Sequence, residues 1–137
     1  MRRSRLVLAL VTFAVTASAC GGGDAPPLTS GTSSGVDPEL AATAIEALCE
    51  IEAASDLEPA RAAFYDRAHA TLHEVVSAAA AADPGSDAEL LIAKQRVEAA
   101  LEESGLPPGF DADVALLRVA ATVALDALGI SPPGCER

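Results

Sequence analysis

Apolar residues recur every three to four positions along four stretches of the chain, which is the spacing of an α-helix that packs one face on a core. Segments rich in proline and glycine, at residues 83–85, 105–109 and 129, separate or end these stretches. The pattern therefore predicts helices near residues 38–54, 57–82, 87–104 and 112–128.

Residues suited to helix N-termini mark the predicted starts. They are Asp37 followed by Pro38, Ser55 with Glu58, Ser86 with Glu89, and Asp111. Because short connections make successive helices antiparallel, the sequence predicts an all-α, up-down antiparallel bundle of about four helices. The link at Ser55-Asp56 is short enough that a kinked continuous helix is the alternative there.

Projection of each helix at about 100° per residue gives the predicted core. It comprises Leu40, Ala44, Ala47, Leu48, Ile51 and Ala54; Phe64, Tyr65, Ala68, Leu72, Val75 and Ala79; Leu90, Val97 and Leu101, with Leu91 at the edge; and Val114, Leu117, Ala121, Leu125 and Leu128. Each predicted helix thus contributes one apolar face.

The last predicted helix has a second apolar face, opposite the first, made of Leu116, Val119 and Val123. Only a narrow polar strip separates the two faces. In a bundle of four helices no helix is fully surrounded, so a second apolar face needs cover. A protein partner and the chain's own tether and C-terminal tail are equally suited to provide it.

The N-terminus has the parts of an export signal. Three arginines precede an apolar run over residues 6–15, and small residues precede Cys20. Ala17-Ser18-Ala19-Cys20 resembles the lipobox of bacterial lipoproteins, with Ala17 where leucine is usual. The resemblance implies that Cys20 carries a thioether-linked diacylglycerol, which anchors the protein to the extracytoplasmic face of the cell membrane. The alternative is an ordinary secretory signal cleaved after Ala19.

Residues 21–36 are rich in glycine, serine, threonine and proline and have no periodic apolar face, which is typical of a flexible tether. The expected organisation is therefore a signal peptide at 1–19, a lipidated cysteine and linker at 20–36, and a helical bundle with a C-terminal tail at 37–137.

Lipidation of Cys20 would leave two further cysteines, Cys49 and Cys135. Exported proteins meet oxidising conditions, so an even pair predicts a disulfide. We expect it on the outer flank of the first helix, with the tail folded back across that helix. The alternative of two metal ligands lacks the close cysteine or histidine spacing of such sites.

Composition excludes several classes of function. The formal net charge is −11 and aromatic residues make up 3% of the chain, so the surface repels nucleic acid and offers few platforms for stacked bases. A glycine-rich phosphate loop and a Gly-x-Ser-x-Gly motif are absent from the sequence. Ser77 stands where a zinc-protease helix beginning at His73-Glu74 would need its second histidine. We expect neither a nucleic-acid partner nor an enzyme.

One group of polar residues has the composition of a ligand site. Asp66, His69 and His73 lie at the border of the apolar face of the second predicted helix. Lys94 falls inside the apolar arc of the third, with Glu98 four residues later. The two histidines with Asp66 and Glu98 suit Zn²⁺ or Cu²⁺, although an ammonium group nearby opposes a cation.

Two alternatives stand beside a metal site. One is a structural polar network in which Lys94 pairs with Glu98, and the other is an organic or anionic ligand held by Lys94. The sequence therefore favours a membrane-anchored exocytoplasmic lipoprotein that needs no cofactor and acts as a helical binding or accessory module. The alternative is a metal-binding or metal-delivery lipoprotein.

Overall fold

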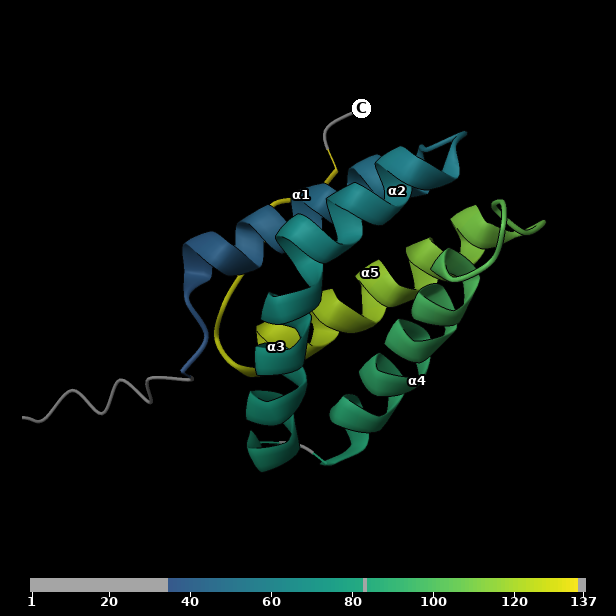
Figure 1. The fold of residues 1–137 in the computed structure, drawn as a ribbon. Coiled ribbons are helices and arrows are strands. Elements are labelled where there is room, and N and C mark those ends of the chain that lie inside the picture. Colours follow the sequence, from purple (N-terminus) through teal and green to yellow (C-terminus); the bar gives the residue numbers. More distant parts are fainter. Residues whose placement is uncertain (1–34, 83, 136–137) are drawn as a thin grey trace, which may run out of the picture. The chain divides into compact units, whose positions relative to one another are not determined.

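The structure is a computed structural model that describes residues 35–82 and 84–135, and this part of the chain is helical and contains no strand. The elements are α1 (Pro38–Glu52), α2 (Leu57–Ala63), η1 (Phe64–Ala68), α3 (His69–Ala82), α4 (Pro84–Leu101) and α5 (Phe110–Ala127) (Figure 1). The prediction of an all-α helical bundle is confirmed. The predicted signal peptide, Cys20 and nearly all of the tether lie outside the described residues.

Helix α5 is the central element of the bundle. It packs against α1, α3 and α4, while α4 also packs on α3 and α1 on η1. Figure 1 shows α5 behind and between α1 and α4, and shows the chain changing direction between α2 and α3. Residues 53–56 separate α1 from α2, so the alternative of one kinked helix across Ser55-Asp56 is wrong.

The second predicted helix, residues 57–82, consists of α2, η1 and α3 because a single π-helical segment interrupts it. Its buried residues Ala60, Phe64, Ala68 and Leu72 are spaced by four, which exceeds the 3.6 residues of an α-helical turn. In a regular α-helix this row would drift around the axis. The wider turn of η1 keeps these side chains on one face.

The predicted core is largely confirmed, with two corrections. Leu40 is 50% exposed, and Tyr65 is exposed as well. On α1 the buried stripe includes Ala41 and Ile45, so it runs one residue away from the projected line and leaves Leu40 outside. Tyr65 lies in η1, whose wider turn differs from the assumed 100° per residue. Ala54 and Leu128 are partly buried and pack against the core.

Helix starts follow the predicted signals in one case of four. The carboxylate Oδ1 of Asp37 accepts hydrogen bonds from the backbone N–H groups of Glu39 (2.8 Å) and Leu40 (3.4 Å), as an N-cap does. The other three capping predictions are wrong: Asp56 rather than Ser55 precedes α2, α4 begins at Pro84 before Ser86, and Gly109 rather than Asp111 precedes α5.

Glycines fix the two ends of α5. Gly109 has φ +82° and Gly129 has φ +75°, a region that side chains disfavour. After α5 the N–H of Gly129 donates to the carbonyl of Asp126 (3.0 Å) and the N–H of Ile130 to that of Leu125 (2.9 Å). This is the Schellman arrangement, and it ends the helix at the predicted break.

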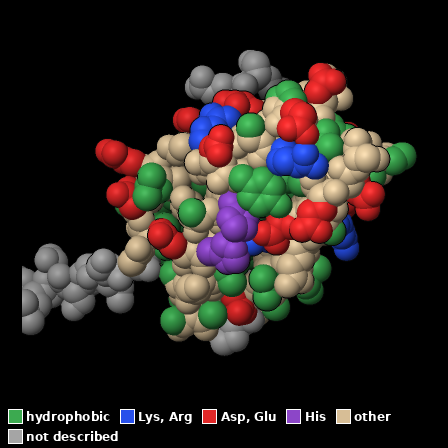
Figure 2. Space-filling model, in the orientation of Figure 1, with side chains coloured by type: hydrophobic (Ala, Val, Ile, Leu, Met, Phe, Trp, Pro, Cys, Tyr) green, Lys and Arg blue, Asp and Glu red, His purple; other side chains and the backbone are tan. Residues whose placement is uncertain are grey.

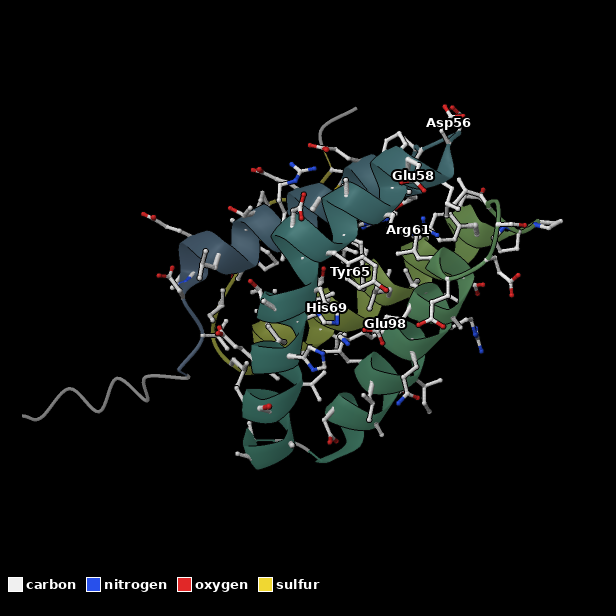
Figure 3. All side chains as sticks on the ribbon, in the orientation of Figure 1. Asp56, Glu58, Arg61, Tyr65, His69 and Glu98 are labelled. Carbon is white, nitrogen blue, oxygen red and sulfur yellow. A yellow bond between two sulfur atoms is a disulfide. The ribbon has the colours of Figure 1, made fainter. Side chains whose placement is uncertain are left out.

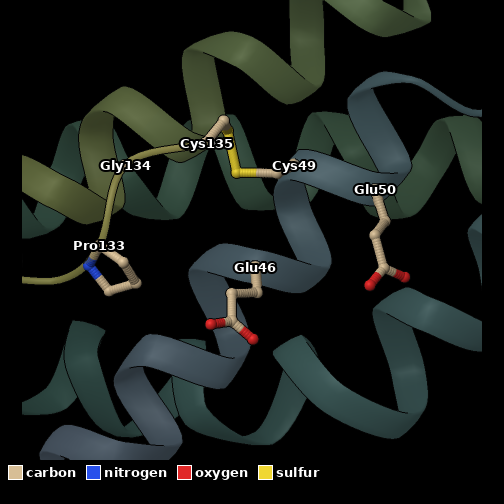
Figure 4. A pocket seen from close by; sticks show the side chains of 6 residues that line it. All are labelled: Glu46, Cys49, Glu50, Pro133, Gly134 and Cys135. Atoms are coloured by element: carbon tan, nitrogen blue, oxygen red, sulfur yellow. A yellow bond between two sulfur atoms is a disulfide. The ribbon is translucent and has the colours of Figure 1, made fainter. Parts of the chain in front are cut away.

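The predicted disulfide between Cys49 and Cys135 is confirmed, with the two Cα atoms 5.6 Å apart. Figure 4 shows it joining α1 to the C-terminal tail, beside the carboxylates of Glu46 and Glu50. Ile130 is buried at the start of this tail. The described tail therefore returns to α1 at Cys49.

Among the described residues, no helix combines the length and apolar character needed to cross a membrane.

Candidate functional site

Helices α3 and α4 bring four of the five predicted site residues together. His69 and His73 lie one turn apart at the start of α3, and Lys94 and Glu98 lie one turn apart on α4. The Nε2 atom of His69 is 2.8 Å from Oε1 of Glu98 and 3.3 Å from Nε2 of His73. We call these four residues the His–Lys–Glu cluster. Figure 2 shows the two histidines side by side at the surface, and Figure 3 shows His69 facing Glu98.

Lys94 is the buried member of the cluster, with 1% of the residue exposed. Its ammonium group donates a hydrogen bond to Oε1 of Glu98 (2.6 Å) and lies 3.0 Å from Nε2 of His73. An ammonium group has only donors, so Nε2 of His73 is the acceptor when Lys94 is charged. His73 is then neutral, with its proton on Nδ1.

The protonation states follow from these contacts. Reduced hydration, the Lys94 ammonium and His69 lower the pKa of His73 below its usual 6.5, and Glu98 opposes this effect. Partial burial of Glu98 acts to raise its pKa, but hydrogen bonds and charge from Lys94 and His69 bring the pKa below its usual 4.5. In the favoured state the Glu98 carboxylate is charged and the His73 ring is neutral.

Asp66 does not join the cluster. It is exposed on η1. Among the described residues, the potential metal ligands that lie close together are His69, His73 and Glu98. Sequence projection placed Asp66 beside the histidines by assuming regular α-helical turns, whereas the wider turn of η1 rotates it away.

Tyr65 takes a place at the edge of the cluster that the sequence did not indicate. Its ring centroid is 5.2 Å from that of His69. Partial burial, followed by the charges of Glu98 and Glu102, raises the pKa of its hydroxyl, and Arg61 opposes this effect. The helical projection assigns Tyr65 to the core, and its hydroxyl is the one feature of the side chain that favours a border position.

The cluster offers three donor atoms to a metal, but Lys94 already uses two of the three side chains. One ligand atom from each of His69, His73 and Glu98 lies within 4.8 Å of the others. The Lys94 ammonium contacts both His73 and Glu98. A divalent ion at this position would meet a positive charge unless Lys94 moved or lost its proton. The arrangement as it stands is a polar network centred on a buried cation.

A second surface feature lies on the other side of α4. A groove of about 290 Å³ runs between α4 and α5. We call it the α4–α5 groove; its lining residues are Glu89, Ile92, Ala93 and Arg96 from α4, and Leu116, Val119, Ala120 and Val123 from α5. Ile92 is 59% exposed and Val119 is 53% exposed, and Leu116 and Val123 are similarly open. These exposed aliphatic side chains come from two adjacent helices and line one continuous groove.

The structure extends the predicted second face of α5. Leu116, Val119 and Val123 are exposed, as the sequence pattern required. The contribution of α4 through Ile92 and Ala93 was missed, because projection of α4 considered only its core face. Of the two predicted covers, the described tail residues pack toward α1 and none of them lines the groove.

Comparison with protein-family models, with curated proteins and with solved structures finds no match to this chain.

Proposed function

We propose that the chain is a membrane-anchored exocytoplasmic lipoprotein whose helical domain binds a protein through the α4–α5 groove. The observation that carries the binding role is the groove itself, because its aliphatic side chains belong to two adjacent helices and are open to solvent. Burial of such side chains against a partner contributes about 25 cal/mol per Å². The anchoring role is supported by the lipobox-like sequence that ends at Cys20.

Anchoring is tested by cell fractionation of the full chain. We expect wild type in the membrane fraction and Cys20→Ser in the soluble exported fraction, because a diacylglycerol supplies the membrane affinity. Equal membrane association of the two forms would contradict anchoring through Cys20.

Binding is tested by placing a photo-crosslinking amino acid at position 119 of the full chain in intact cells. The matched control position is 40, because Leu40 is also an aliphatic residue about half exposed, on α1. We expect a defined crosslinked protein from position 119 and none from position 40. Absence of any defined product from position 119 would refute the binding role of the groove.

Metal binding is the second candidate function, and the three donor atoms within 4.8 Å favour it. On this candidate, His69→Ala and His73→Ala each abolish Zn²⁺ or Cu²⁺ binding by the full chain. Lys94→Met strengthens binding, because it removes a positive charge from the ligand set. If added metal leaves the melting temperature of wild type unchanged, the cluster is a structural network and this candidate fails.

A further inference from the structure

The α4–α5 groove has a repeated pattern along both of its walls. The lining residues of α4 are at positions 89, 92, 93 and 96, and those of α5 are at 116, 119, 120 and 123. Each wall therefore follows the i, i+3, i+4, i+7 spacing with which helices pack on other helices. Alanines at 93 and 120 are the smallest side chains in the groove, and small side chains let a helix of a partner approach closely. The occupant that this surface suits is helical.

Charge at the rim limits which helical partner fits. Glu89 and Arg96 are the two charged residues that line the groove, and they lie two helical turns apart on α4. The rim thus carries one charge of each sign, at the two ends of the exposed stripe of α4. A membrane surface rich in anionic lipid favours several basic residues, and this rim offers one. The rim also disfavours a partner of uniform charge, since such a partner would repel one of its two ends.

We infer that the occupant is a second copy of this chain, docked about a two-fold axis so that α4 lies antiparallel to α4 of the partner; this rests on the proposed function. In that arrangement Glu89 of each copy meets Arg96 of the other, and Ile92 and Ala93 lie near the axis. A two-fold interface requires such self-complementarity, in which residue i contacts residue j and j contacts i.

Arg96 can form this interchain pair in addition to its contact within its own chain. Arg96 makes an ion pair with Asp113 in its own chain at 3.3 Å, but a guanidinium has five donors and can bind a second carboxylate. Anchoring of both copies in one membrane raises their effective concentration, so a groove of modest size is sufficient. The excess of acidic over basic residues repels the copies at long range, and the two interchain pairs act against that repulsion at close range.

The test uses full chains with two different affinity tags, expressed together in cells and extracted in mild detergent. Each variant, Glu89→Arg or Arg96→Glu, is first expressed alone as two differently tagged copies. The two variants are then expressed together, each with its own tag. A chain with either substitution would set like charges opposite each other in its own dimer. The mixed pair restores two opposite-charge contacts.

We expect each variant alone to recover severalfold less of the second tag than wild type, and the mixture to recover as much as wild type. Rescue by mixing also excludes misfolding as the cause of the loss. A mixture no better than the single variants would overturn the second copy as the occupant. If wild-type copies do not associate but position 119 crosslinks another protein, this inference fails and the proposed function stands. If position 119 crosslinks nothing, both fail.

Discussion

Lys94 is the only lysine in the chain, and its ammonium group is buried where α3 meets α4. The sequence predicted this position, because Lys94 falls between apolar residues on the helical projection of α4. One of the alternatives drawn from the sequence pairs Lys94 with Glu98 one turn away, because i, i+4 spacing brings the two side chains together, and the structure contains this ion pair. The place of Asp66 was not predictable, because no sequence rule used for the projection accounts for a π-helical turn.

Glu98→Gln and Lys94→Met break the same ion pair, but we expect them to lower the free energy of unfolding by different amounts. Loss of the carboxylate leaves a buried ammonium without a counter-charge, and we expect a loss of about 2 kcal/mol, or about 10 °C in melting temperature. Loss of the ammonium leaves a carboxylate that is partly open to solvent and still bonded to His69, so we expect less than about 1 kcal/mol. Thermal unfolding of both variants checks this order, and the reverse order would contradict the described network.

Acid is expected to destabilise the domain through His73 first. A histidine whose folded pKa is lowered favours the native state above its unfolded pKa of 6.5, and this contribution is lost as pH falls through the folded pKa. Glu98 acts in the same direction at lower pH, below its usual 4.5. The free energy of unfolding, measured by denaturant between about pH 7.5 and about pH 5.5, should therefore decrease. In His73→Gln, which keeps an acceptor for Lys94, the decrease should be smaller; an equal decrease would exclude His73 as its source.

At the scale of helices, element type was predictable and several boundaries were not. Gly109 precedes α5 and Gly129 follows it, as the conformational freedom of glycine suggests. Ser86 and Asp111 matched capping patterns, yet each lies inside the first turn of a helix that begins earlier. Pro84 is compatible with a first helical turn, so local capping signals left two competing starts. On α5 the buried Phe110 precedes Asp111, so packing on the core favours the earlier start there.

The π-helical turn should make one deletion tolerable. Removal of Asp66 from η1 allows the segment to become a regular α-helix while α3 keeps its buried face, at a cost of about 1 kcal/mol. Removal of Glu74, the matched exposed acidic residue within α3, rotates Val75 and Ala79 away from the core and should cost more than about 4 kcal/mol. Chemical denaturation compares the two, and equal losses would contradict the role given to η1.

At the scale of the whole molecule, the Cys49–Cys135 disulfide links the first helix to the tail. The pairing was predictable because lipidation of Cys20 would leave two cysteines. The place of the tail was predictable only in outline, since the burial of Ile130 depends on how the tail packs against the assembled hydrophobic core. What no sequence pattern indicated is that α4 supplies half of the groove, because that requires knowing which helices are neighbours.

Loss of the disulfide should destabilise the domain strongly. The two cysteines are 86 residues apart in sequence. Without the disulfide the unfolded chain gains the conformational freedom of a loop of that length, which lowers the free energy of unfolding by about 3–5 kcal/mol. We expect Cys49→Ser, Cys135→Ser and the double variant to lower the melting temperature by similar amounts, since each breaks the same bond. A single variant as stable as wild type would show that the bond contributes little to folding.

Binding through the α4–α5 groove determines the size of the complex that the full chain forms in mild-detergent extracts of membranes, and this size is the decisive measurement. Val119→Asp places a charge in the α4–α5 groove, and Leu40→Asp places the same charge on an equally exposed aliphatic position of α1. We expect wild type and Leu40→Asp to migrate as a complex larger than one chain and Val119→Asp to migrate as a single chain, with similar melting temperatures for both variants. A complex of unchanged size in Val119→Asp would contradict the assignment of binding to the groove.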